Sequence, residues 1–519
     1  MGTRFSVILG MFLPVALLAQ TLPAAQPIPQ FEDITKRTGL TVPHNSTPEK
    51  RYIVESMSGG VGFIDCDNDG KLDILTINGS SVDRYRKGGD PMITLYHQDA
   101  DLKFTDITQA AGLTRKGWGM GVSVMDFDND GWQDIYVTGY GGNALYRNLG
   151  NCKFEDVTDK AGLRVGGFST GAAWADYDRD GFVDLFVPRY VHVDMNNLPE
   201  FGSDDKFCRY RGVMVQCGPG GLPGESDFLF RNRGDGTFED IGLLSGTALS
   251  LDGKEQGSMG VDFGDFDHDG RLDIFVTNFV NEPDALYWNQ GEQGFTDIGW
   301  KAGIAKATTP LVGWGTGFVD FVNDGWLDIF EVNGHVYPQM DYIKGAAGYK
   351  QPVLLYRNNR DRTFEDITAL SGLDKLPPAS RRGAAFGDLN NDGKIDILML
   401  NVGQPPTLLL NRTRTSNHAV LFKLIGTKSN KAAIGARVSV TAGGVVQFTE
   451  VRSGTSYLSQ NDLRLHFGLG KETTMDTVEV SWPSGKKEIY KDLASDFIYT
   501  ITEGTGVQQK TPFEVGDKP

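Results

Sequence analysis

Aspartates recur along this chain in a pattern suited to binding a hard cation. The first stretch is Asp65-Cys66-Asp67-Asn68-Asp69-Gly70-Lys71-Leu72-Asp73, and five related stretches follow. Alternating carboxylates with a glycine after the third place oxygens around one point, which suits the six to eight oxygen ligands of Ca²⁺. Without a cation, two carboxylates about 4 Å apart repel by roughly 4 kcal/mol at an effective dielectric constant near 20. The spacing therefore predicts six calcium loops.

The expected ligands lie at loop positions 1, 3, 5 and 9, with glycine at position 6. They are Asp65, Asp67, Asp69 and Asp73; Asp126, Asp128, Asp130 and Asp134; Asp176, Asp178, Asp180 and Asp184; Asp265, Asp267, Asp269 and Asp273; Asp320, Asp324 and Asp328; and Asp388, Asn390, Asp392 and Asp396. Asn390 still offers an oxygen, whereas Val322 at position 3 of the fifth loop offers none. We expect about five to six calcium ions, with the fifth site the weakest.

These loops differ from the EF-hand, which needs a bidentate Glu at position 12 inside a helix. Position 12 is Glu in one copy only, Glu331, and that copy lacks its third-position Asp. The residues after the loops, such as Asp134-Ile135-Tyr136-Val137, are β-branched and aromatic, which is typical of strands. The sequence therefore predicts calcium loops between strands.

The net charge of −17 belongs to these loops. They contain 22 of the 67 acidic residues, which leaves 45 against 50 lysines and arginines. No basic stripe is visible, so nucleic acid is not an expected partner.

The first 25 residues have the features of a secretory signal peptide. Arg4 precedes an apolar stretch from Phe5 to Leu18, and Ala-rich and Pro-rich sequence follows. That stretch is too short for a membrane span, and no other segment reaches 18 apolar residues. We expect a secreted protein, in the periplasm or at the cell surface if bacterial.

The four cysteines predict at least one disulfide. Cys208 and Cys217 flank an irregular Gly/Pro-rich segment at a spacing typical of a local bridge. Cys66, at loop position 2, is expected to be a buried free thiol, and the state of Cys152 is open.

A repeat of four short strands accompanies each loop. In order, a unit reads Phe-x-Asp-Ile, a Gly-rich strand, the calcium loop with Asp-Ile-Phe-Val, and Leu-Tyr-Arg-Asn. Four-stranded units repeated radially form a β-propeller. We predict an all-β fold: a propeller of six or seven blades over residues 26–412, a small antiparallel β-sandwich over 413–505, and a disordered tail over 506–519.

Two sets of motifs resemble known families. The Asp loops resemble the FG-GAP/VCBS repeats of integrin α-subunit propellers. Ile434-Gly435-Ala436-Arg437-Val438, Leu465-His466-Phe467-Gly468-Leu469-Gly470 and the segment Ser453 to Gln460 are similar to the ASPIC/UnbV domain. A propeller followed by that domain is the layout of the cartilage acidic protein family, and Asn333 to Pro338 resembles its bacterial members. The resemblance implies a calcium-bound extracellular adhesion or interaction protein.

An enzyme is the alternative, because propellers of this repeat type also occur in polysaccharide lyases. Gly167-Phe168-Ser169-Thr170-Gly171 matches a nucleophile pattern, but it precedes no helix. His335 and Tyr337 could form an acid/base pair, but no partner is identifiable in the sequence, which favours a structural histidine. The leading interpretation is a scaffold that binds an extracellular protein or glycan, without a catalytic residue that sequence can name; the alternative is a calcium-dependent polysaccharide lyase or hydrolase.

Length differences between the repeats predict where a partner binds. The connections at about residues 78–91, 188–226 and 332–352 are long, whereas the same connections in the other units are short. Equivalent connections emerge on one side of a propeller, so the three insertions should share a face. Arg and Tyr are enriched at interfaces, and the expected partner-binding residues there are Tyr190, Tyr210, Arg211, His335 and Tyr337.

Overall fold

The computed structural model describes residues 27–100, 102–198, 201–203, 208–242 and 259–514. The expected signal peptide lies outside the described residues. Within them, strands dominate and the helices are single turns: α1 (Thr35–Thr38), α2 (Val54–Met57), α3 (Val82–Tyr85) and α5 (Ala305–Thr308), with 3₁₀ turns η2 (Gly291–Gln293), η3 (Pro338–Tyr342) and η4 (Leu373–Lys375). No described helix has the length and apolar character needed to cross a membrane.

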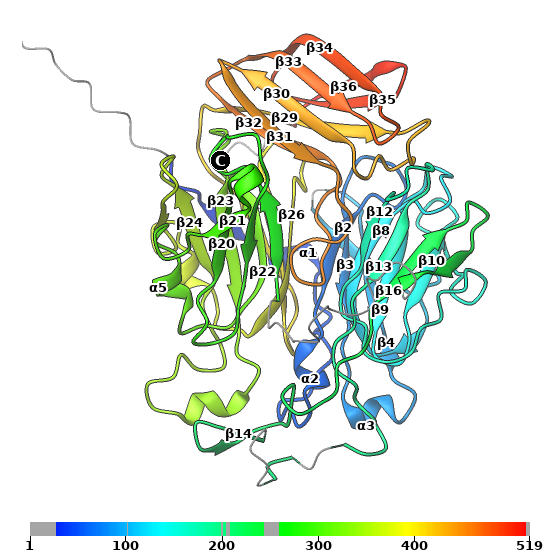
Figure 1. The fold of residues 1–519 in the computed structure, drawn as a ribbon, viewed down its shortest axis with the longest axis vertical. Helices are drawn as coiled ribbons and strands as arrows, with labels where there is room; N and C mark the ends of the chain where they lie inside the picture. Colours follow the sequence, from blue (N-terminus) through cyan, green and yellow to red (C-terminus); the bar gives the residue numbers. More distant parts are fainter. Residues whose placement is uncertain (1–26, 101, 199–200, 204–207, 243–258, 515–519) are drawn as a thin grey trace, which may run out of the picture.

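Among the described residues, six four-stranded antiparallel sheets, each holding one of the Asp loops, form a propeller (Figure 1). The sheets are numbered as blades 1 to 6 along the chain. Their strands, from the first to the fourth, are β2 (Val61–Ile64), β3 (Asp73–Ile77), β5 (Ile93–Gln98) and β6 (Phe104–Asp106); β8 (Gly119–Met125), β9 (Asp134–Gly139), β10 (Ala144–Asn148) and β11 (Phe154–Asp156); β12 (Ala173–Ala175), β13 (Asp184–Val187), β16 (Phe228–Asn232) and β17 (Phe238–Asp240); β18 (Val261–Gly264), β19 (Asp273–Val276), β20 (Ala285–Asn289) and β21 (Phe295–Asp297); β22 (Gly313–Val319), β23 (Asp328–Asn333), β24 (Leu354–Asn358) and β25 (Phe364–Asp366); and β26 (Arg381–Gly387), β27 (Asp396–Asn401), β28 (Thr407–Asn411) and β1 (Phe31–Asp33).

The Phe-x-Asp strand belongs to the preceding blade, not to the following unit as the sequence order suggested. In blade 2, Phe154 of β11 pairs with Asn148 of β10. The first strand of the chain, β1, therefore completes the last blade, where Phe31 pairs with Asn411 of β28. A blade that combines both ends of the repeat region ties the two ends together, which protects the strand edges that an open array would expose.

A row of hydrogen bonds joins the Asp loops of neighbouring blades. The side chain at loop position 4 bonds to the carbonyl oxygen of the glycine at position 6 in the next loop, as Asn68 does to Gly131 at 3.1 Å. The same bond joins Asn129 to Gly181, His268 to Gly325, Asn323 to Gly393 and, between blades 6 and 1, Asn391 to Gly70. Among the described residues, blades 3 and 4 lack this bond, because Arg179 stands at position 4.

The C-terminal domain is a sandwich of two four-stranded sheets, which lies above the propeller in Figure 1. One sheet has the order β32 (Leu465–Gly470), β29 (His418–Ile425), β35 (Phe497–Thr502) and β36 (Gly506–Pro512); the other has β31 (Val445–Glu450), β30 (Arg437–Ala442), β33 (Thr474–Ser481) and β34 (Lys487–Ala494). The expectation of a purely antiparallel sandwich was wrong at one place, since β29 and β35 are parallel.

The expected disordered tail was also wrong over most of its described length. Residues 506–512 form β36, which pairs with β35. The backbone N–H of Phe513 then donates to the Asp496 carbonyl at 3.0 Å, and that of Glu514 donates to the Asn391 carbonyl at 2.8 Å. Polar composition suggested disorder, but strand pairing satisfies the backbone there.

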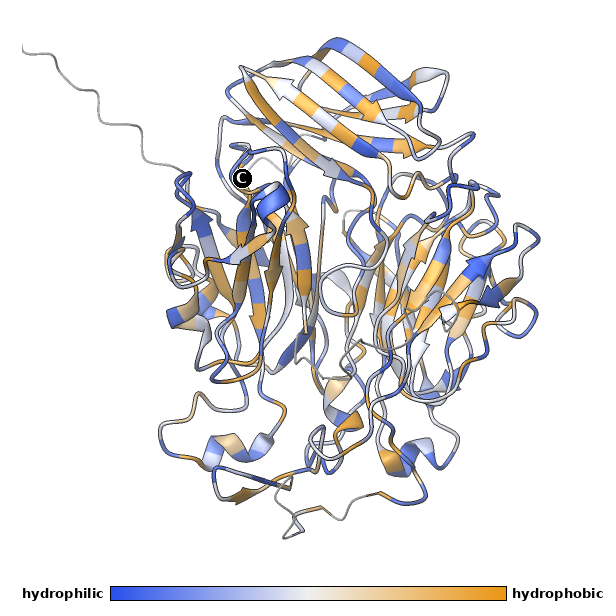
Figure 2. Ribbon diagram, in the orientation of Figure 1, coloured by the Kyte–Doolittle hydropathy of each residue, from blue (hydrophilic) through white to orange (hydrophobic). Residues whose placement is uncertain are grey.

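Hydrophobic residues are concentrated on the blade strands, and the loops carry a larger share of hydrophilic residues (Figure 2). Glycine stands just before the inner strands where another part of the chain approaches, either a neighbouring blade or the C-terminal domain. A Cβ added at Gly60 would lie 2.0 Å from the Leu458 carbonyl oxygen, and one at Gly260 would lie 1.8 Å from that of Trp314. Only glycine fits these approaches, which explains the Gly-rich pattern of the entry strands.

Residues 453–460 of the C-terminal domain, which we name the channel segment, enter the centre of the propeller. The segment bonds to inner strands of several blades: Gln460 N–H to the Val61 carbonyl, Val122 N–H to Leu458, Trp174 N–H to Ser453 and Val261 N–H to Ser456, at 2.9 to 3.3 Å. Backbone hydrogen bonds at the centre of the propeller therefore join the C-terminal domain to several blades.

Candidate calcium loops and the insertion face

The six Asp loops have the same backbone conformation. The residue at position 4 has φ between 56° and 61° in every loop, and the glycine at position 6 has φ between 79° and 94°. Glycine adopts this left-handed conformation at little cost, whereas other residues do so rarely. The fifth loop keeps this conformation although Val322 replaces a ligand.

Backbone N–H groups hold the first and last carboxylates of each loop. In the second loop, Asp130 N–H and Gly131 N–H donate to the two oxygens of Asp126 at 3.1 and 2.8 Å. Asp134, at position 9, accepts from Phe127 N–H at 3.0 Å and from Asn148 N–H at 2.7 Å. The side chain of Asn148 also donates to the Cys66 carbonyl of blade 1 at 2.9 Å. The Asn of the Leu-Tyr-Arg-Asn strand thus orients a ligand and bonds to the neighbouring blade.

Three carboxylates come close together in each of the first four loops. Within each group, one ligand oxygen from every residue lies within 4.8 Å of the others: Asp65, Asp67 and Asp69; Asp126, Asp128 and Asp134; Asp176, Asp178 and Asp180; and Asp265, Asp267 and Asp269. These are the loops in which the sequence has Asp at all four ligand positions. In the fifth and sixth loops, Val322 and Asn390 take the place of the third-position Asp.

The donor set fits Ca²⁺, and unpartnered oxygens support this fit. The buried atoms Asp128 Oδ1, Asp267 Oδ1 and Asn390 Oδ1 lack a hydrogen-bond partner, and all three belong to position 3. A buried polar atom without a partner costs about 1 to 3 kcal/mol. A cation in the loop would satisfy these oxygens, and carboxylate and amide oxygens are the ligands that Ca²⁺ prefers.

Burial raises the pKa values of the carboxyls at loop positions 1 and 9. Burial raises the pKa of Asp126 to about 7, and the charges of Asp130 and Asp128 act in the same direction. Burial also raises the pKa of Asp265 to about 6 and that of Asp388 to about 7. Calcium binds the ionised forms, so it must compete with protons for these groups.

Basic side chains cover the outward oxygens of several loops. Arg147 contacts Asp128 at 2.5 Å and Asp130 at 2.8 Å, and Arg362 contacts Asp267 at 2.6 Å. These arginines hold one oxygen of the third-position carboxylate, while the other oxygen is buried without a partner. The arginines therefore leave an oxygen available for the ion.

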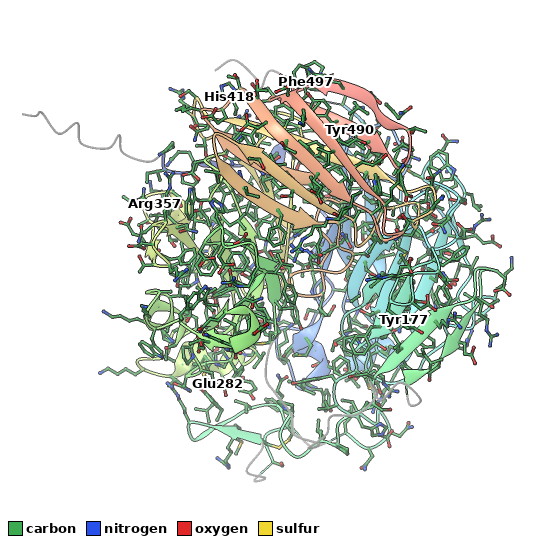
Figure 3. The ribbon with its side chains drawn as sticks, turned by 45° about the horizontal axis from the view of Figure 1, so that its top comes forward. Tyr177, Glu282, Arg357, His418, Tyr490 and Phe497 are labelled. Atoms are coloured by element: carbon green, nitrogen blue, oxygen red, sulfur yellow. A yellow bond between two sulfur atoms is a disulfide. The ribbon has the colours of Figure 1, made fainter. Side chains whose placement is uncertain are left out.

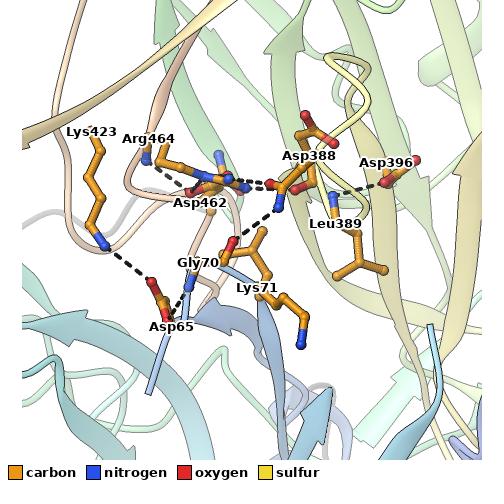
Figure 4. Close-up of polar contacts among 12 residues, drawn as sticks. Asp65, Gly70, Lys71, Asp388, Leu389, Asp396, Lys423, Asp462 and Arg464 are labelled. Carbon is orange, nitrogen blue, oxygen red and sulfur yellow. Dashed lines mark hydrogen bonds and ion pairs between the residues drawn. The ribbon is translucent and has the colours of Figure 1, made fainter. Parts of the chain in front are cut away.

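The sandwich lies directly on the loops (Figure 4). Lys423 Nζ contacts Asp65 Oδ2 at 3.2 Å, and Arg464 donates to the Asp388 carbonyl at 2.6 Å. The fifth loop is covered most completely: Asn417 donates to the Val322 carbonyl at 2.9 Å, and Gly470 N–H donates to the Asn323 carbonyl at 2.8 Å. The fifth loop, which has fewer oxygen ligands, thus uses two backbone carbonyls to bind the C-terminal domain.

The three insertions share the face opposite the sandwich, as their place in the repeats predicts (Figure 1). The first carries α3 and β4 (Asp90–Pro91), which pairs with β7 (Lys116–Gly117). The second carries the hairpin β14 (Arg209–Tyr210) and β15 (Val213–Met214), and the third carries η3. Arg86 of the first insertion bonds to the Met195 carbonyl of the second. We name this surface the insertion face.

The five expected partner-binding residues fall into two groups. The Tyr210 ring lies 5.7 Å from that of His335 and 5.5 Å from that of Tyr337, and Arg211 lies over Tyr210 at 5.6 Å. Tyr190 lies apart from them, with its ring 5.5 Å from Phe168. His335 and Tyr337 are buried, whereas Tyr190 and Tyr210 are half-buried and Arg211 is exposed.

Burial determines the charge of the His335 imidazole. Its Nδ1 accepts from Tyr337 N–H at 3.0 Å, while Nε2 is buried without a partner. Burial, with the charges of Arg382 and Arg211, lowers the pKa of His335 to about 3. The imidazole is therefore neutral at physiological pH, as a structural histidine would be.

A cavity of about 730 Å³ lies between blades 3 and 4, the channel segment and the insertion face. Its lining includes the aromatic side chains Tyr190, Trp314, Tyr337 and Tyr457, together with Arg189 and Glu282; Glu282 is labelled at the lower left of Figure 3. Ligand sites of proteins commonly have volumes of about 300 to 1,000 Å³ and an aromatic lining with few polar groups. Two of the expected partner-binding residues thus line a space of ligand size.

Both cysteine pairs form disulfides, so no cysteine is free. Cys208 and Cys217 bridge the second insertion, as predicted. The expectation of a free thiol at Cys66 was wrong: Cys66 of blade 1 is bonded to Cys152 of blade 2, with Cα atoms 4.9 Å apart. The sequence held a hint of this bridge. Cys66 and Cys152 each stand at a repeat position where the compared sister copies have no cysteine.

The repeats and the second domain define a class of protein: a β-propeller with Asp loops and a C-terminal β-sandwich. The chain belongs to the FG-GAP-like repeat family, whose model matches residues 65–137, 126–187, 220–276, 265–331 and 340–399. The model "ASPIC and UnbV" matches residues 426–508. This is the arrangement that the sequence motifs indicated.

The curated proteins that are similar in sequence to this chain include cartilage acidic proteins. Cartilage acidic protein 1 of Homo sapiens is 29% identical over 305 residues, which are 56% of this chain and 43% of the relative. The Mus musculus protein is 28% identical over 284 residues, 53% of this chain and 41% of the relative. The match thus spans less than half the length of these relatives.

Solved structures show a loose likeness. A lectin of Agrocybe aegerita that recognises non-reducing terminal N-acetylglucosamine has a TM-score of 0.30 at 18% identity, over 69% of this chain and 81% of the lectin. The rhamnogalacturonan lyase YesW has a TM-score of 0.31 at 13% identity, over 68% of this chain and 71% of the lyase. At these TM-scores no functional argument follows from the likeness.

Proposed function

We propose that this protein is a secreted, calcium-bound scaffold that binds an extracellular protein or carbohydrate at its insertion face. The ligand set of the six loops, from Asp65 to Asp396, is proposed to hold about five to six calcium ions. The ions stabilise the ring, and the insertions contact the partner.

The calcium part of the proposal is supported by the loops themselves. Oxygen ligands repeat at fixed spacing, their backbone is the same in all copies, and the third-position oxygens of three loops are buried without a partner. When bound, calcium would neutralise the clustered carboxylates and fix the two strands that flank each loop.

The observation that carries the binding part is the convergence of the three insertions on one face. Tyr210 lies near Tyr337 of the third insertion and near Arg211 of its own, and Tyr190 and Tyr337 line the 730 Å³ cavity. The opposite face is occupied by the sandwich. The insertion face therefore carries the loops whose lengths differ between repeats. It also presents aromatic and arginine side chains beside a cavity.

Secretion is proposed from three features. The chain has two disulfides, which are typical of exported proteins. The sequence of residues 1–25 has the composition of a signal peptide. Calcium is plentiful outside the cell, so even weak loops would fill there.

The test is a binding screen of the mature chain against extracellular proteins and a glycan array, with and without EDTA. The variant Tyr190→Ala/Tyr210→Ala/Arg211→Ala should lose capture of the partner while its calcium-dependent melting is retained. The matched control is Tyr490→Ala/Phe497→Ala on the sandwich, both labelled in Figure 3, which should retain capture.

The reverse result, capture lost only in the sandwich variant, would refute the insertion face as the binding surface. Glycan ligands should also be assayed for new reducing ends. Their release by the wild-type chain would favour the calcium-dependent carbohydrate-active enzyme over the scaffold.

A further inference from the structure

A group of buried polar side chains lies between blades 4 and 5, away from the six calcium loops. Asp284 precedes β20, and Glu331 and Asn333 lie in β23. Their exposed fractions are 2%, 0% and 0%. In the sister repeats, the position of Glu331 is occupied by Thr76, Val137, Val187, Val276 and Met399. A carboxyl group has therefore replaced a residue that packs in the core of other blades.

Six polar atoms of this group lack a partner in the rest of the described chain. Asp284 Oδ2, both carboxyl oxygens of Glu331, both amide atoms of Asn333 and the hydroxyl of Tyr356 are buried, and among the described residues they have no well-formed hydrogen bond outside the group. Within the group, the Glu331 carboxyl is in hydrogen-bonding contact with Asp284 and Asn333. Each such atom costs about 1 to 3 kcal/mol if nothing satisfies it. Contacts within the group pair one carboxyl with another, so they leave these oxygens without a donor unless a proton or a cation lies between them.

The side chains also act on one another. Burial raises the pKa of Glu331 well above its usual value, and the neighbouring Asp284 carboxyl is the next cause. Burial raises the pKa of the Tyr356 hydroxyl, and the charges of Glu331 and Asp284 raise it further. The packing agrees: a Cβ added at Gly313 would lie 3.3 Å from Asp284 Oδ2, and Gly313 pairs with Asn333 across β22 and β23. Asp284 therefore lies beside the strand that carries Glu331 and Asn333.

In the described part of the chain, no basic side chain forms an ion pair with either carboxyl. The strongest charges on Glu331 are those of Asp284 and Asp366, which are both negative. Among the described residues, no lysine or arginine contributes to the shift of Asp284. The calcium loops differ in this respect, because Arg147 and Arg362 pair with their carboxylates. Two buried carboxylates without a basic partner require a cation or protons.

We propose that Asp284, Glu331 and Asn333 bind a divalent cation, Ca²⁺ in a calcium-rich medium, at a site between blades 4 and 5. The donors are hard oxygens: Asp284 Oδ2, the two oxygens of Glu331 and Asn333 Oδ1. Such a set matches Ca²⁺ rather than zinc or copper, which favour nitrogen and sulfur. A 2+ ion neutralises both carboxylates and satisfies four of the six unpartnered atoms.

The site differs from an EF-hand although it uses the Glu at position 12 of the fifth Asp stretch. Position 1 of that stretch, Asp320, is bonded by the backbone of its own loop at Gly325. Glu331 lies on the strand after the loop and meets Asp284 of the preceding blade. The ion would therefore join two blades, whereas the Asp loops each bind within one.

Metal counting on the full-length chain tests the proposal. The protein is stripped with EDTA, dialysed against Ca²⁺ and measured by elemental analysis. Glu331→Gln and Asp284→Asn should each bind one ion fewer than the wild type, and the double variant should also lose one ion rather than two. A control, Asp128→Asn in the second loop, should combine additively with either variant.

An unchanged ion count in folded Glu331→Gln and Asp284→Asn would overturn the proposal and leave a carboxyl pair that shares a proton. Crystals of the wild-type chain soaked in Mn²⁺ avoid any folding defect of the variants. An anomalous peak between Asp284 and Glu331 is expected. Peaks confined to the Asp loops would overturn the proposal without affecting the calcium loops themselves.

Discussion

The hydroxyl of Tyr457 donates a hydrogen bond to the Met57 carbonyl at 2.8 Å, across 400 residues of sequence. Tyr457 lies at the tip of the channel segment, and Met57 ends α2 on the insertion side of the propeller. The Tyr457 ring also lies 4.8 Å from that of Trp314. The C-terminal domain therefore reaches through the ring to the elements that line the proposed binding face.

Removal of the Tyr457 hydroxyl should weaken the contact between the C-terminal domain and the propeller. Tyr457→Phe leaves the buried Met57 carbonyl without its partner, so we expect a loss of about 1 kcal/mol in the free energy of unfolding. Urea denaturation measures it. Tyr342→Phe, at a side chain that is 88% exposed, is the control, and an equal effect of both changes would contradict the importance of the contact.

The calcium loops should differ in affinity according to their ligands. Asp126→Ala removes one of four carboxylates from the second loop, whereas Asp320→Ala alters a loop that already lacks a ligand at Val322. We expect Asp126→Ala to lose more calcium affinity, on the order of tenfold or about 1.4 kcal/mol at that site. Calorimetric titration of both variants is the measurement; a larger loss in Asp320→Ala would contradict this order.

The stability of the calcium-free protein should fall as pH rises. Burial raises the pKa of Asp126 and Asp388 to about 7 in the folded chain, against an ordinary value of 3.8. The folded state then binds more protons than the unfolded state between about pH 4 and 7, so stability decreases with pH across this range. In EDTA, we expect a lower Tm at pH 7.5 than at pH 5.

Calcium should reverse this trend, because the ion replaces the protons and binds more tightly as they leave. Thermal melts at both pH values, with excess Ca²⁺ or EDTA, compare the two states. A Tm in EDTA that rises from pH 5 to 7.5 would show that these carboxyls are not protonated in the folded chain.

The two disulfides should contribute unequally. Cys66 and Cys152 are separated by 86 residues, and Cys208 and Cys217 by 9. A bridge across a longer loop restricts the unfolded chain more, and a long-loop disulfide contributes about 2 to 5 kcal/mol. Cys66→Ala/Cys152→Ala should therefore lower the Tm more than Cys208→Ala/Cys217→Ala. Similar melting of the two variants would contradict the expectation.

Local features of the fold could be predicted from the sequence, whereas the partners across blades could not. The loop of Asp126 to Asp134 is set by residues within nine positions, so spacing alone indicated its form. The pairing of Cys66 with Cys152 depends on how blade 1 meets blade 2, and no single repeat contains that information. The same holds for the Phe-x-Asp strands, whose pairing partners follow from the order of strands in the completed sheet.

The second domain shows a further limit. Alternating apolar residues indicated its strands, but the parallel pairing of β29 with β35 and the place of β36 depend on the sandwich as a whole. The Ser453 to Gln460 motif was visible as a pattern, yet its position inside the propeller was not. Glu331 was noted only as a poor match to the EF-hand, because its neighbour Asp284 belongs to another blade.

The calcium content of the purified full-length chain, measured together with its melting temperature before and after chelation, tests the central claim most directly. We expect about five to six ions in the Asp loops and a strong fall in Tm in EDTA, since each filled site adds about 2.7 kcal/mol when free calcium is a hundred times its Kd. A chain that contains no calcium after dialysis against it, and whose Tm is the same in EDTA, would contradict the account.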